Sequence, residues 1–171
     1  SDVNQDGIPA TIADLVYLIR IIVEGPSLAG KIFSVNEEVE FRIQKQGDRF
    51  NFYTNTKNNL GGAAFVIEYD PNSNISLEFS EALASMDRLY KKEEEGVLRI
   101  LIYSLEGKAI TFGENLLFTV QTESENLNIK QVEFSNDLGN LLKVRTDKVT
   151  QVLIPEKFSL EQNYPNPFNL E

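Results

Sequence analysis

Three oxygen-bearing side chains alternate at the start of the chain and are followed by a glycine. Asp2, Asn4 and Asp6 are each separated by one residue, and Gly7 comes next. This is the spacing of an EF-hand-type calcium loop, in which a tightly curved backbone aims alternate oxygens at one centre. The glycine supplies the conformation that a sharp turn needs and that a side chain resists. The chemistry predicted for this stretch is Ca²⁺ binding.

The remaining ligands are expected between the loop and a following helix. Ile8 would contribute only its backbone carbonyl, and Asp14 would close the shell from the first helical turn. Asp14 stands one residue later than the last ligand of the standard loop, so a one-residue bulge is expected at 9–11. Ala10 has no side-chain oxygen, so a water or Thr11 would fill its place. Thr11 and Asp14 also match a capping box, in which Asp14 would bind backbone donors instead.

The residues after the loop predict a helix over 12–24 that stops at Gly25-Pro26. Apolar side chains cover most of its circumference, and such a helix cannot stand alone in water. We expect it to pack on an upstream repeat, on the β domain that follows, or on a second molecule by self-association.

The loop and helix resemble one repeat of a dockerin, the calcium-loop-and-helix module that docks onto cohesin domains. The matching stretches are Asp2-Val3-Asn4-Gln5-Asp6-Gly7 and Ala13-Asp14-Leu15-Val16-Tyr17-Leu18. Dockerins usually carry two repeats. The resemblance therefore implies a single repeat over 1–25, in a fragment whose other repeat lay upstream.

Composition excludes several classes of function. The 171 residues include 26 acidic and 16 basic side chains and no histidine or cysteine, which gives a net charge of −10. This balance argues against a nucleic acid or anionic membrane partner, because both require a basic face. The lack of cysteine and histidine removes thiol nucleophiles and Cys/His zinc sites. No apolar run is long enough to span a bilayer.

From about residue 38 the apolar period changes from helical to alternating. Alternation in 39–44 and again in 49–54, across a Gly47-Asp48 turn, predicts a hairpin. Gly61-Gly62 indicates a bulge or a close backbone approach. A helical turn is expected within 80–86. Further strands are predicted at 63–69, 75–79, 89–92, 97–104, 115–123, 129–135, 141–144 and 149–154.

Roughly nine short strands with regular turns predict a mainly β chain folded as an antiparallel β-sandwich. We expect it, Ig-like or jelly-roll-like, over 36–154 after a linker at 26–35. Three apolar strand segments stand out: Gly62-Ala63-Ala64-Phe65-Val66-Ile67-Glu68-Tyr69-Asp70-Pro71, Leu98-Arg99-Ile100-Leu101-Ile102-Tyr103-Ser104 and Leu116-Leu117-Phe118-Thr119-Val120. On these segments the stretch resembles a cohesin domain, which implies a cohesin-like sandwich and a dockerin–cohesin-like interaction between proteins.

The C-terminal tail over 155–171 carries a second specific motif, Gln162-Asn163-Tyr164-Pro165-Asn166-Pro167-Phe168-Asn169. It resembles the start of the C-terminal sorting domain of the type IX secretion pathway of Gram-negative bacteria. The resemblance implies a secreted or cell-surface protein. The family continues past this point with a further β domain, whereas Leu170-Glu171 is expected to be a cloning scar.

We assign no catalytic residues, and the leading hypothesis is a non-catalytic, calcium-binding structural or adhesion module. The first alternative is a carbohydrate-binding sandwich for a polysaccharide, which needs a row of exposed aromatics. Tyr53, Tyr90 and Tyr103 could supply one, although aromatics at alternating strand positions more often pack in the core or across strands. The remote alternative is a small glycoside hydrolase, which needs two facing carboxylates in a cleft.

Overall fold

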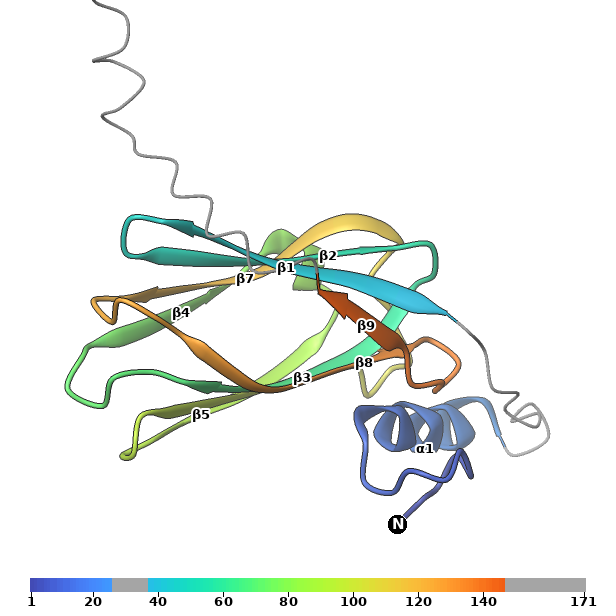
Figure 1. The fold of residues 1–171 in the computed structure, drawn as a ribbon. Coiled ribbons are helices and arrows are strands. Elements are labelled where there is room, and N and C mark those ends of the chain that lie inside the picture. The colour runs from blue at the N-terminus through green and yellow to red at the C-terminus, as the bar shows by residue number, and fades with distance from the viewer. Residues whose placement is uncertain (26–36, 147–171) are drawn as a thin grey trace, which may run out of the picture.

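The computed structural model describes residues 1–25 and 37–146. These residues form two packed β-sheets with one helix, α1 (Ile12–Glu24), lying outside them (Figure 1). The predicted helix bounds are confirmed. The helix is capped by Thr11 and ends at Gly25, whose amide donates to the Ile21 carbonyl at 2.9 Å. The linker predicted at 26–35, the strand predicted at 149–154 and the tail at 155–171 lie outside the described residues.

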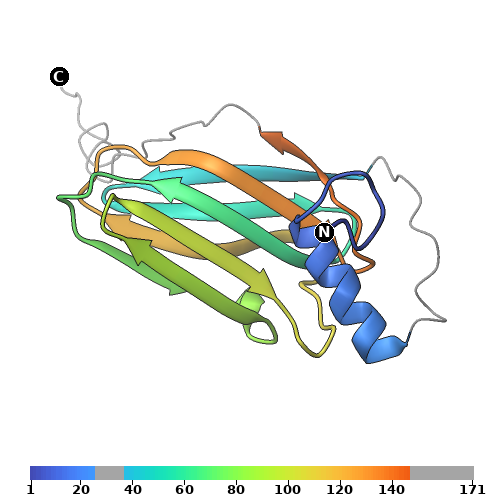
Figure 2. The ribbon, with the colours of Figure 1, turned by 90° about the horizontal axis from the view of Figure 1, so that it is seen from below.

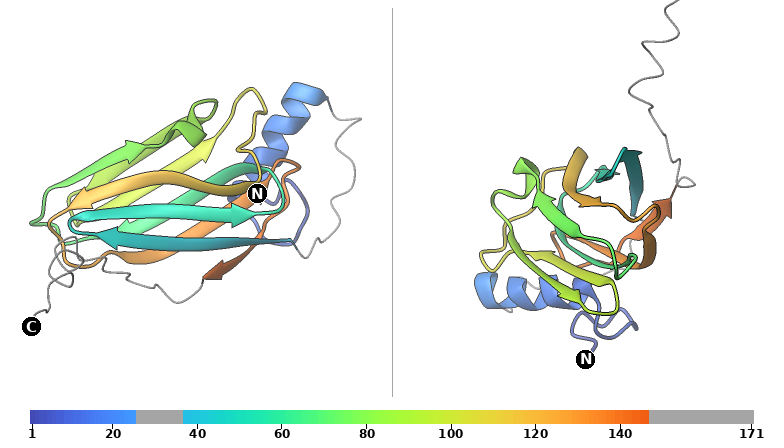
Figure 3. Two further views of the ribbon diagram at one scale, coloured as in Figure 1. Left: turned by 90° about the horizontal axis from the view of Figure 1, so that it is seen from above. Right: turned by 90° about the vertical axis from the view of Figure 1, so that its left-hand side faces the viewer.

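Nine strands are present in the described part of the chain. Their bounds are β1 (Glu38–Gln46), β2 (Arg49–Thr56), β3 (Leu60–Glu68), β4 (Ile75–Phe79), β5 (Asp87–Glu93), β6 (Val97–Tyr103), β7 (Gly113–Thr122), β8 (Asn128–Asn136) and β9 (Lys143–Thr146). The expected helical turn is a short 3-10 helix, η1 (Glu81–Leu83). One sheet has the order β4-β7-β2-β1-β9 and the other β5-β6-β3-β8. The end-on view in Figure 3 shows these two layers.

The sandwich is predominantly antiparallel, as predicted, with one exception. β9 pairs with β1 in parallel, and Val39 lies opposite Val144. The reason is a change of sheet: after β8 the chain turns and leaves the four-stranded layer for the open edge of the five-stranded layer. The strand expected at 141–144 is also shorter at its start, because Leu141 makes only an isolated bridge to Ser135.

The core lies between the sheets and is built from the inward half of each alternating strand. In β1, Val39, Phe41 and Ile43 are buried, while the residues between them are more exposed. Five phenylalanines from both sheets meet in this space, with ring centroids between 4.4 and 6.2 Å apart: Phe41, Phe52, Phe65, Phe118 and Phe134. Burial of each such ring stabilises the fold by about 1.5–3 kcal/mol, so the core holds the two layers together.

The helix packs on its own chain, against the four-stranded sheet. It contacts the start of β3 and the end of β8, and Figure 2 shows it at one end of that sheet. The bulge or close backbone approach predicted at Gly61-Gly62 is confirmed: the register of β3 against β8 shifts between Leu60 and Gly62, and a Cβ on Gly61 would lie 2.5 Å from the Asn136 carbonyl oxygen. Among the described residues, no helix covers the rest of the outer face of this sheet.

Candidate functional site

Polar side chains of the N-terminal loop accept hydrogen bonds from the backbone of the loop itself. The backbone amide of Asp6 donates to Asp2 Oδ1 at 3.1 Å and to Asn4 Oδ1 at 3.2 Å, which brings these two oxygens to one point. Asp6 Oδ2 accepts from Asn4 Nδ2 at 2.8 Å. In the described residues no three acidic side chains form a group that could hold a metal alone. A cation here would therefore also depend on the Asn4 amide oxygen and on backbone carbonyls such as that of Ile8.

Asp14 occupies the capping position that the sequence offered as its alternative role. Asp14 Oδ2 accepts from the Thr11 amide at 2.8 Å and from Thr11 Oγ1 at 3.2 Å, and Asp14 N donates to Thr11 Oγ1 at 3.3 Å. Asp14 Oδ1 accepts from the amides of Val3 at 2.6 Å and Asn4 at 3.2 Å. The carboxylate thus ties the loop to the start of α1. A metal that took Asp14 as a ligand would compete with these donors.

The electrostatics of Asp14 follow from those contacts. Burial of the carboxylate disfavours its charge, but three backbone amides and the Thr11 hydroxyl donate to it and hold the pKa of Asp14 below its ordinary value. The ionised side chain also lies in the first turn of α1, where the helix dipole favours a negative charge. Asp14 therefore stabilises the joint between loop and helix in its charged form.

Ile8 and Ala10 form the last turn before the helix. The Ile8 amide donates to Asp6 Oδ1 at 2.8 Å, and the Ile8 side chain is exposed. Ala10 adopts a left-handed φ of 63° and donates its amide to the Ser1 carbonyl at 3.2 Å. This is the stretch in which a one-residue bulge was predicted, and the strained residue marks where the chain turns back to the helix.

Three glycines form the surface on which α1 rests, and we call Gly61, Gly62 and Gly139 the glycine seat. A Cβ on Gly61 would lie 2.8 Å from Val16 Cγ1 and one on Gly62 would lie 3.0 Å from Ile12 Cγ1. Real Cβ atoms are rarely found so close to a neighbour, so a side chain at either position would push the helix away. The seat exists because the second and third residues of β3 have no side chain.

The third glycine joins the seat to both loop and helix. Gly139, in the turn between β8 and β9, has a φ of +88°, and a Cβ there would lie 2.7 Å from Tyr17 Cβ and 2.9 Å from Tyr17 Cα. Its carbonyl accepts a buried hydrogen bond from Asn4 Nδ2 at 3.0 Å. One predicted ligand residue, Asn4, therefore also fixes the loop to the sandwich.

Beside α1, the open part of the outer face forms a broad groove of about 570 Å³. Cross-strand pairing sets Leu89 opposite Leu101, and Leu101 opposite Ala64, in one apolar row across β5, β6 and β3. The wall of the groove is the start of the helix, including Ile12 and Leu15. Leu89 is 57% exposed although it lies in this row. The groove thus offers apolar surface to water without a cover among the described residues.

The two banks of the groove carry opposite charge. Lys91 and Arg99 face each other across β5 and β6, whereas Gln131 and Glu133 lie on β8 at the other side. Arg99 pairs with Glu93 at 2.9 Å. A partner bound here would be oriented by this asymmetry, because each of its flanks would meet a different charge.

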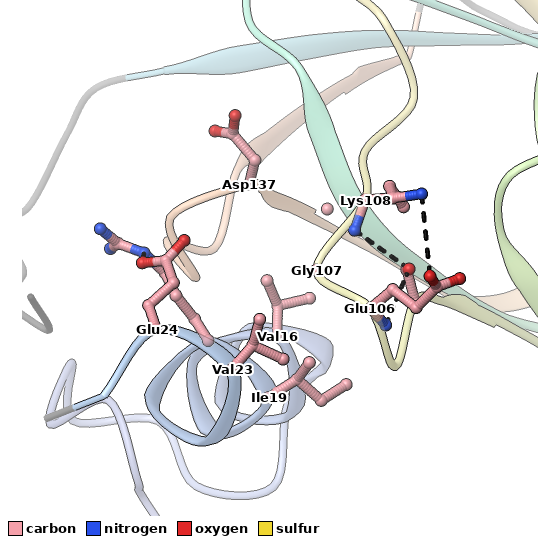
Figure 4. Close-up of a pocket in the computed structure, with 11 residues that line it drawn as sticks. Val16, Ile19, Val23, Glu24, Glu106, Gly107, Lys108 and Asp137 are labelled. Carbon is pink, nitrogen blue, oxygen red and sulfur yellow. Dashed lines mark hydrogen bonds and ion pairs between the residues drawn. The ribbon is translucent and has the colours of Figure 1, made fainter.

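A smaller hollow of about 60 Å³ lies under the other end of α1 (Figure 4). Val16, Ile19 and Val23 of the helix face Gly107 and Lys108 of the loop between β6 and β7. The hollow is large enough for water only. It marks the C-terminal limit of the contact between helix and sandwich.

The three tyrosines considered for a carbohydrate-binding surface have different surroundings. Arg42 covers the Tyr53 ring at 4.2 Å from its centroid, and the Tyr90 ring packs beside Phe79 at 6.2 Å. Tyr103 is half-buried. Across residues 1–25 and 37–146 these tyrosines therefore do not form an exposed row for stacking sugars.

A cluster of glutamates lines a second hollow, of about 540 Å³, beside β1 and β9. Arg145 pairs with Glu38 at 3.8 Å and with Glu40 at 2.6 Å. These carboxylates serve a surface ion-pair network, which is not the arrangement of an acid and a base facing each other across a cleft. The network also joins β9 to β1, the parallel pair at the sheet edge.

The sequence did not reveal the groove. Leu89, Leu101 and Ala64 lie on three strands, and they meet only once strand order and register are known. One signal was available: Leu89 is the one aliphatic residue of a strand whose other residues are charged or aromatic. Such a residue on an edge strand indicates a contact outside the sheet.

Comparison with known proteins yields a match in fold. No protein-family profile and no curated protein matches the chain. A non-cellulosomal cohesin from the archaeon Archaeoglobus fulgidus superimposes with a TM-score of 0.52 at 16% identity, covering 64% of this chain and 86% of that one. The complex of the OlpC cohesin with the Doc435 dockerin from Clostridium thermocellum gives 0.54 at 8% identity, covering 69% and 94%.

The third cohesin of ScaC from Acetivibrio cellulolyticus, solved with the ScaB dockerin, gives a TM-score of 0.53 at 12% identity and covers 64% of this chain and 94% of that one. The predicted cohesin-like sandwich is therefore confirmed as a fold. In the part of the chain that the structure describes, no helix is long and apolar enough to cross a membrane.

Proposed function

We propose that this chain is a non-catalytic protein-interaction module whose partner docks in the groove on the β5-β6-β3-β8 sheet. The observation that carries the proposal is the apolar row of Leu89, Leu101 and Ala64, left open on an otherwise acidic protein. An exposed apolar surface with charged banks is typical of a protein-binding site. The groove is formed by sheet and helix together, so its wall is present when α1 is docked.

The partner that fits best is a dockerin-like module, that is, a calcium loop followed by an apolar helix. Two of the structurally similar cohesins were solved in complex with dockerins. A helix with one apolar stripe would cover the row on the groove floor, and its flanks would meet Lys91 on one bank and Glu133 on the other. This mode needs no chemistry beyond burial of apolar surface and complementary charge.

We also propose that the N-terminal loop binds Ca²⁺ through Asp2, Asn4, Asp6 and the Ile8 carbonyl. Support comes from the convergence of the Asp2 and Asn4 oxygens on one point and from an all-oxygen donor set, which a hard cation prefers. Asp14 would either complete the shell or remain in the capping box. Because the loop carries the helix that walls the groove, bound calcium would stabilise the wall.

The setting we propose is outside the cell. Support comes from the type IX sorting motif at 162–169, which lies outside the described residues, and from the acidic composition. The chain would then be one module of a secreted or cell-surface protein. Fusing residues 155–169 to a reporter in a bacterium with this pathway would test whether the motif takes part in export.

The docking proposal can be tested with two matched leucine substitutions. Leu89 is 57% exposed in the groove, and Leu105 is 64% exposed in the loop after β6, outside it. Leu89→Lys and Leu105→Lys make the same chemical change at similar exposure, so neither should alter stability by much. We would screen displayed dockerin modules in millimolar calcium against the chain and measure the affinity of the binders by titration calorimetry.

We expect Leu89→Lys to weaken binding by about tenfold or more, because a charge enters the apolar contact. Leu105→Lys should bind as the unaltered chain does. Equal affinities for the two variants would show that the groove is not the docking surface. Absence of any binder in the screen would show that the partner is not a dockerin-like module.

A further inference from the structure

We propose that the glycine seat also accepts the loop–helix unit, residues 1–25, of a second copy of this chain. In such an exchange each copy places its unit on the sandwich of the other. The start of α1, which walls the groove, would then come from the partner copy. The inference concerns the seat and does not depend on what binds in the groove.

The unit is a self-contained piece of structure. Its loop amides are satisfied by its own side chains, and its capping box is formed by Thr11 and Asp14 alone. A buried hydrogen bond joins it to the sandwich, from Asn4 Nδ2 to the Gly139 carbonyl at 3.0 Å. The unit can therefore leave the seat without breaking its internal hydrogen bonds.

Undocking the helix would expose apolar side chains to water, which favours its binding to another apolar surface. Ile12, Val16 and Ile19 are buried where the helix faces the sandwich. On the far side, Leu18 is 41% exposed and Ile22 is 73% exposed even when the helix is docked. Off the seat, the helix would thus expose apolar side chains over most of its circumference. Any surface that allows equally close packing will compete for it.

The seat is such a surface, and it is specific for this helix. Gly139 lets the sandwich backbone approach Tyr17, and Gly61 with Gly62 makes room for Val16. A second copy carries the same helix and can make the same contacts, including the bond from Asn4. Binding within one copy and binding between copies therefore differ in the tether and not in the interface.

The tether sets the concentration at which exchange becomes significant. Eleven residues, 26–36, stand between the described unit and the described sandwich in the sequence, and eleven residues span at most about 36–40 Å. A tether of this kind gives an effective concentration of about a millimolar for binding within one copy. Copies free in dilute solution should stay separate, and copies crowded to that level should exchange.

Cysteine chemistry offers a direct test, because the chain has no cysteine of its own. Val23 on the helix and Lys108 on the sandwich line the same hollow (Figure 4). We would prepare the full chain as Val23→Cys, as Lys108→Cys and as the double variant. The single variants would be mixed at total concentrations from ten micromolar to one millimolar, incubated, and treated with a short bis-maleimide cross-linker. Intact mass spectrometry would identify the products.

We expect the mixture to give a heterodimer in which Val23→Cys of one copy is cross-linked to Lys108→Cys of the other. At the dilute end, the fraction of the chain found in this heterodimer should rise roughly tenfold for each tenfold increase in total concentration. The double variant should cross-link within one copy. A matched mixture of Val23→Cys with Lys57→Cys, a position lining the separate hollow beside β1, should give no more than background. Leu89→Lys, placed in both copies, should leave the exchange unchanged even if it abolishes docking in the groove.

The incubation must be long enough for the helix to undock, which hydrogen exchange of the α1 amides would establish. Two controls must hold: the α1 amides exchange fully, and the double variant cross-links within one copy. If the one-millimolar mixture then gives only background heterodimer, the seat accepts only the helix of its own copy and the proposal is wrong. A heterodimer as abundant with Lys57→Cys as with Lys108→Cys would overturn it equally, since the contact would then not be at the seat.

Discussion

The packing of α1 on its own sandwich can be tested by adding one methyl group. Gly139→Ala places a Cβ 2.7 Å from Tyr17 Cβ and 2.9 Å from Tyr17 Cα. Gly107→Ala is the matched control, because both glycines have positive φ, +88° and +72°. At Gly107 the nearest atom to the added Cβ is Val23 Cγ1 at 3.8 Å, an ordinary contact. Only the first substitution collides with the helix.

The expected magnitudes follow from this difference. An alanine held at positive φ costs about 1–2 kcal/mol, and both variants should lose this much. Gly139→Ala must in addition move the helix or the turn, since the obstructing atoms include backbone that cannot rotate aside. Overpacking of this kind costs about 1–3 kcal/mol. We expect Gly139→Ala to lower the free energy of unfolding by about 2 kcal/mol more than Gly107→Ala.

Urea unfolding followed by circular dichroism would measure both values. Hydrogen exchange would show where the loss falls, and the α1 amides should lose protection in Gly139→Ala and keep it in Gly107→Ala. If the two variants lose equal stability and protect α1 equally, the helix does not rest on Gly139 and the description of the seat is wrong.

Four further predictions concern single side chains. Asn4→Asp removes the donor to the Gly139 carbonyl and should destabilise the docked loop by about 1–3 kcal/mol in urea unfolding. The pKa of Asp14 is lowered in the folded chain, so its contribution is complete above the ordinary carboxyl pKa and is lost as pH falls through the lower, folded value. Melting temperatures below about pH 4 should therefore fall less steeply in Asp14→Asn. Thr54 Oγ1 is buried with no hydrogen-bond partner among the described residues, so Thr54→Val should keep or raise stability by about 1 kcal/mol. Millimolar calcium should raise the melting temperature of the chain above its value in EDTA, and Asp6→Ala should abolish that difference.

Local patterns in the sequence were sufficient for much of the fold. The helix over 12–24 is specified by its cap and its terminal glycine, both of which act within a few residues. Alternation in β1 identified which of its residues face the core. Gly61-Gly62 indicated a bulge or a close backbone approach, because glycine beside an apolar strand often marks one or the other.

What the sequence could not give depends on contacts between distant residues. The helix needed a cover, yet its apolar residues fit an upstream repeat, a second molecule or the sandwich equally well. The helix packs on the sandwich because Gly139, more than a hundred residues away, contacts Tyr17 and accepts a hydrogen bond from Asn4. The parallel pairing of β9 with β1 is likewise set by a change of sheet that no local pattern records.

The measurement that tests docking in the groove most directly is an NMR titration of the isotope-labelled full chain with a calcium-loaded dockerin-like module selected for binding. Chemical-shift changes should concentrate at Ala64, Val66 and Leu101, on the open face beside α1. Changes centred on the five-stranded sheet, or spread evenly over both layers, would contradict the proposal that the groove is where this protein meets its partner.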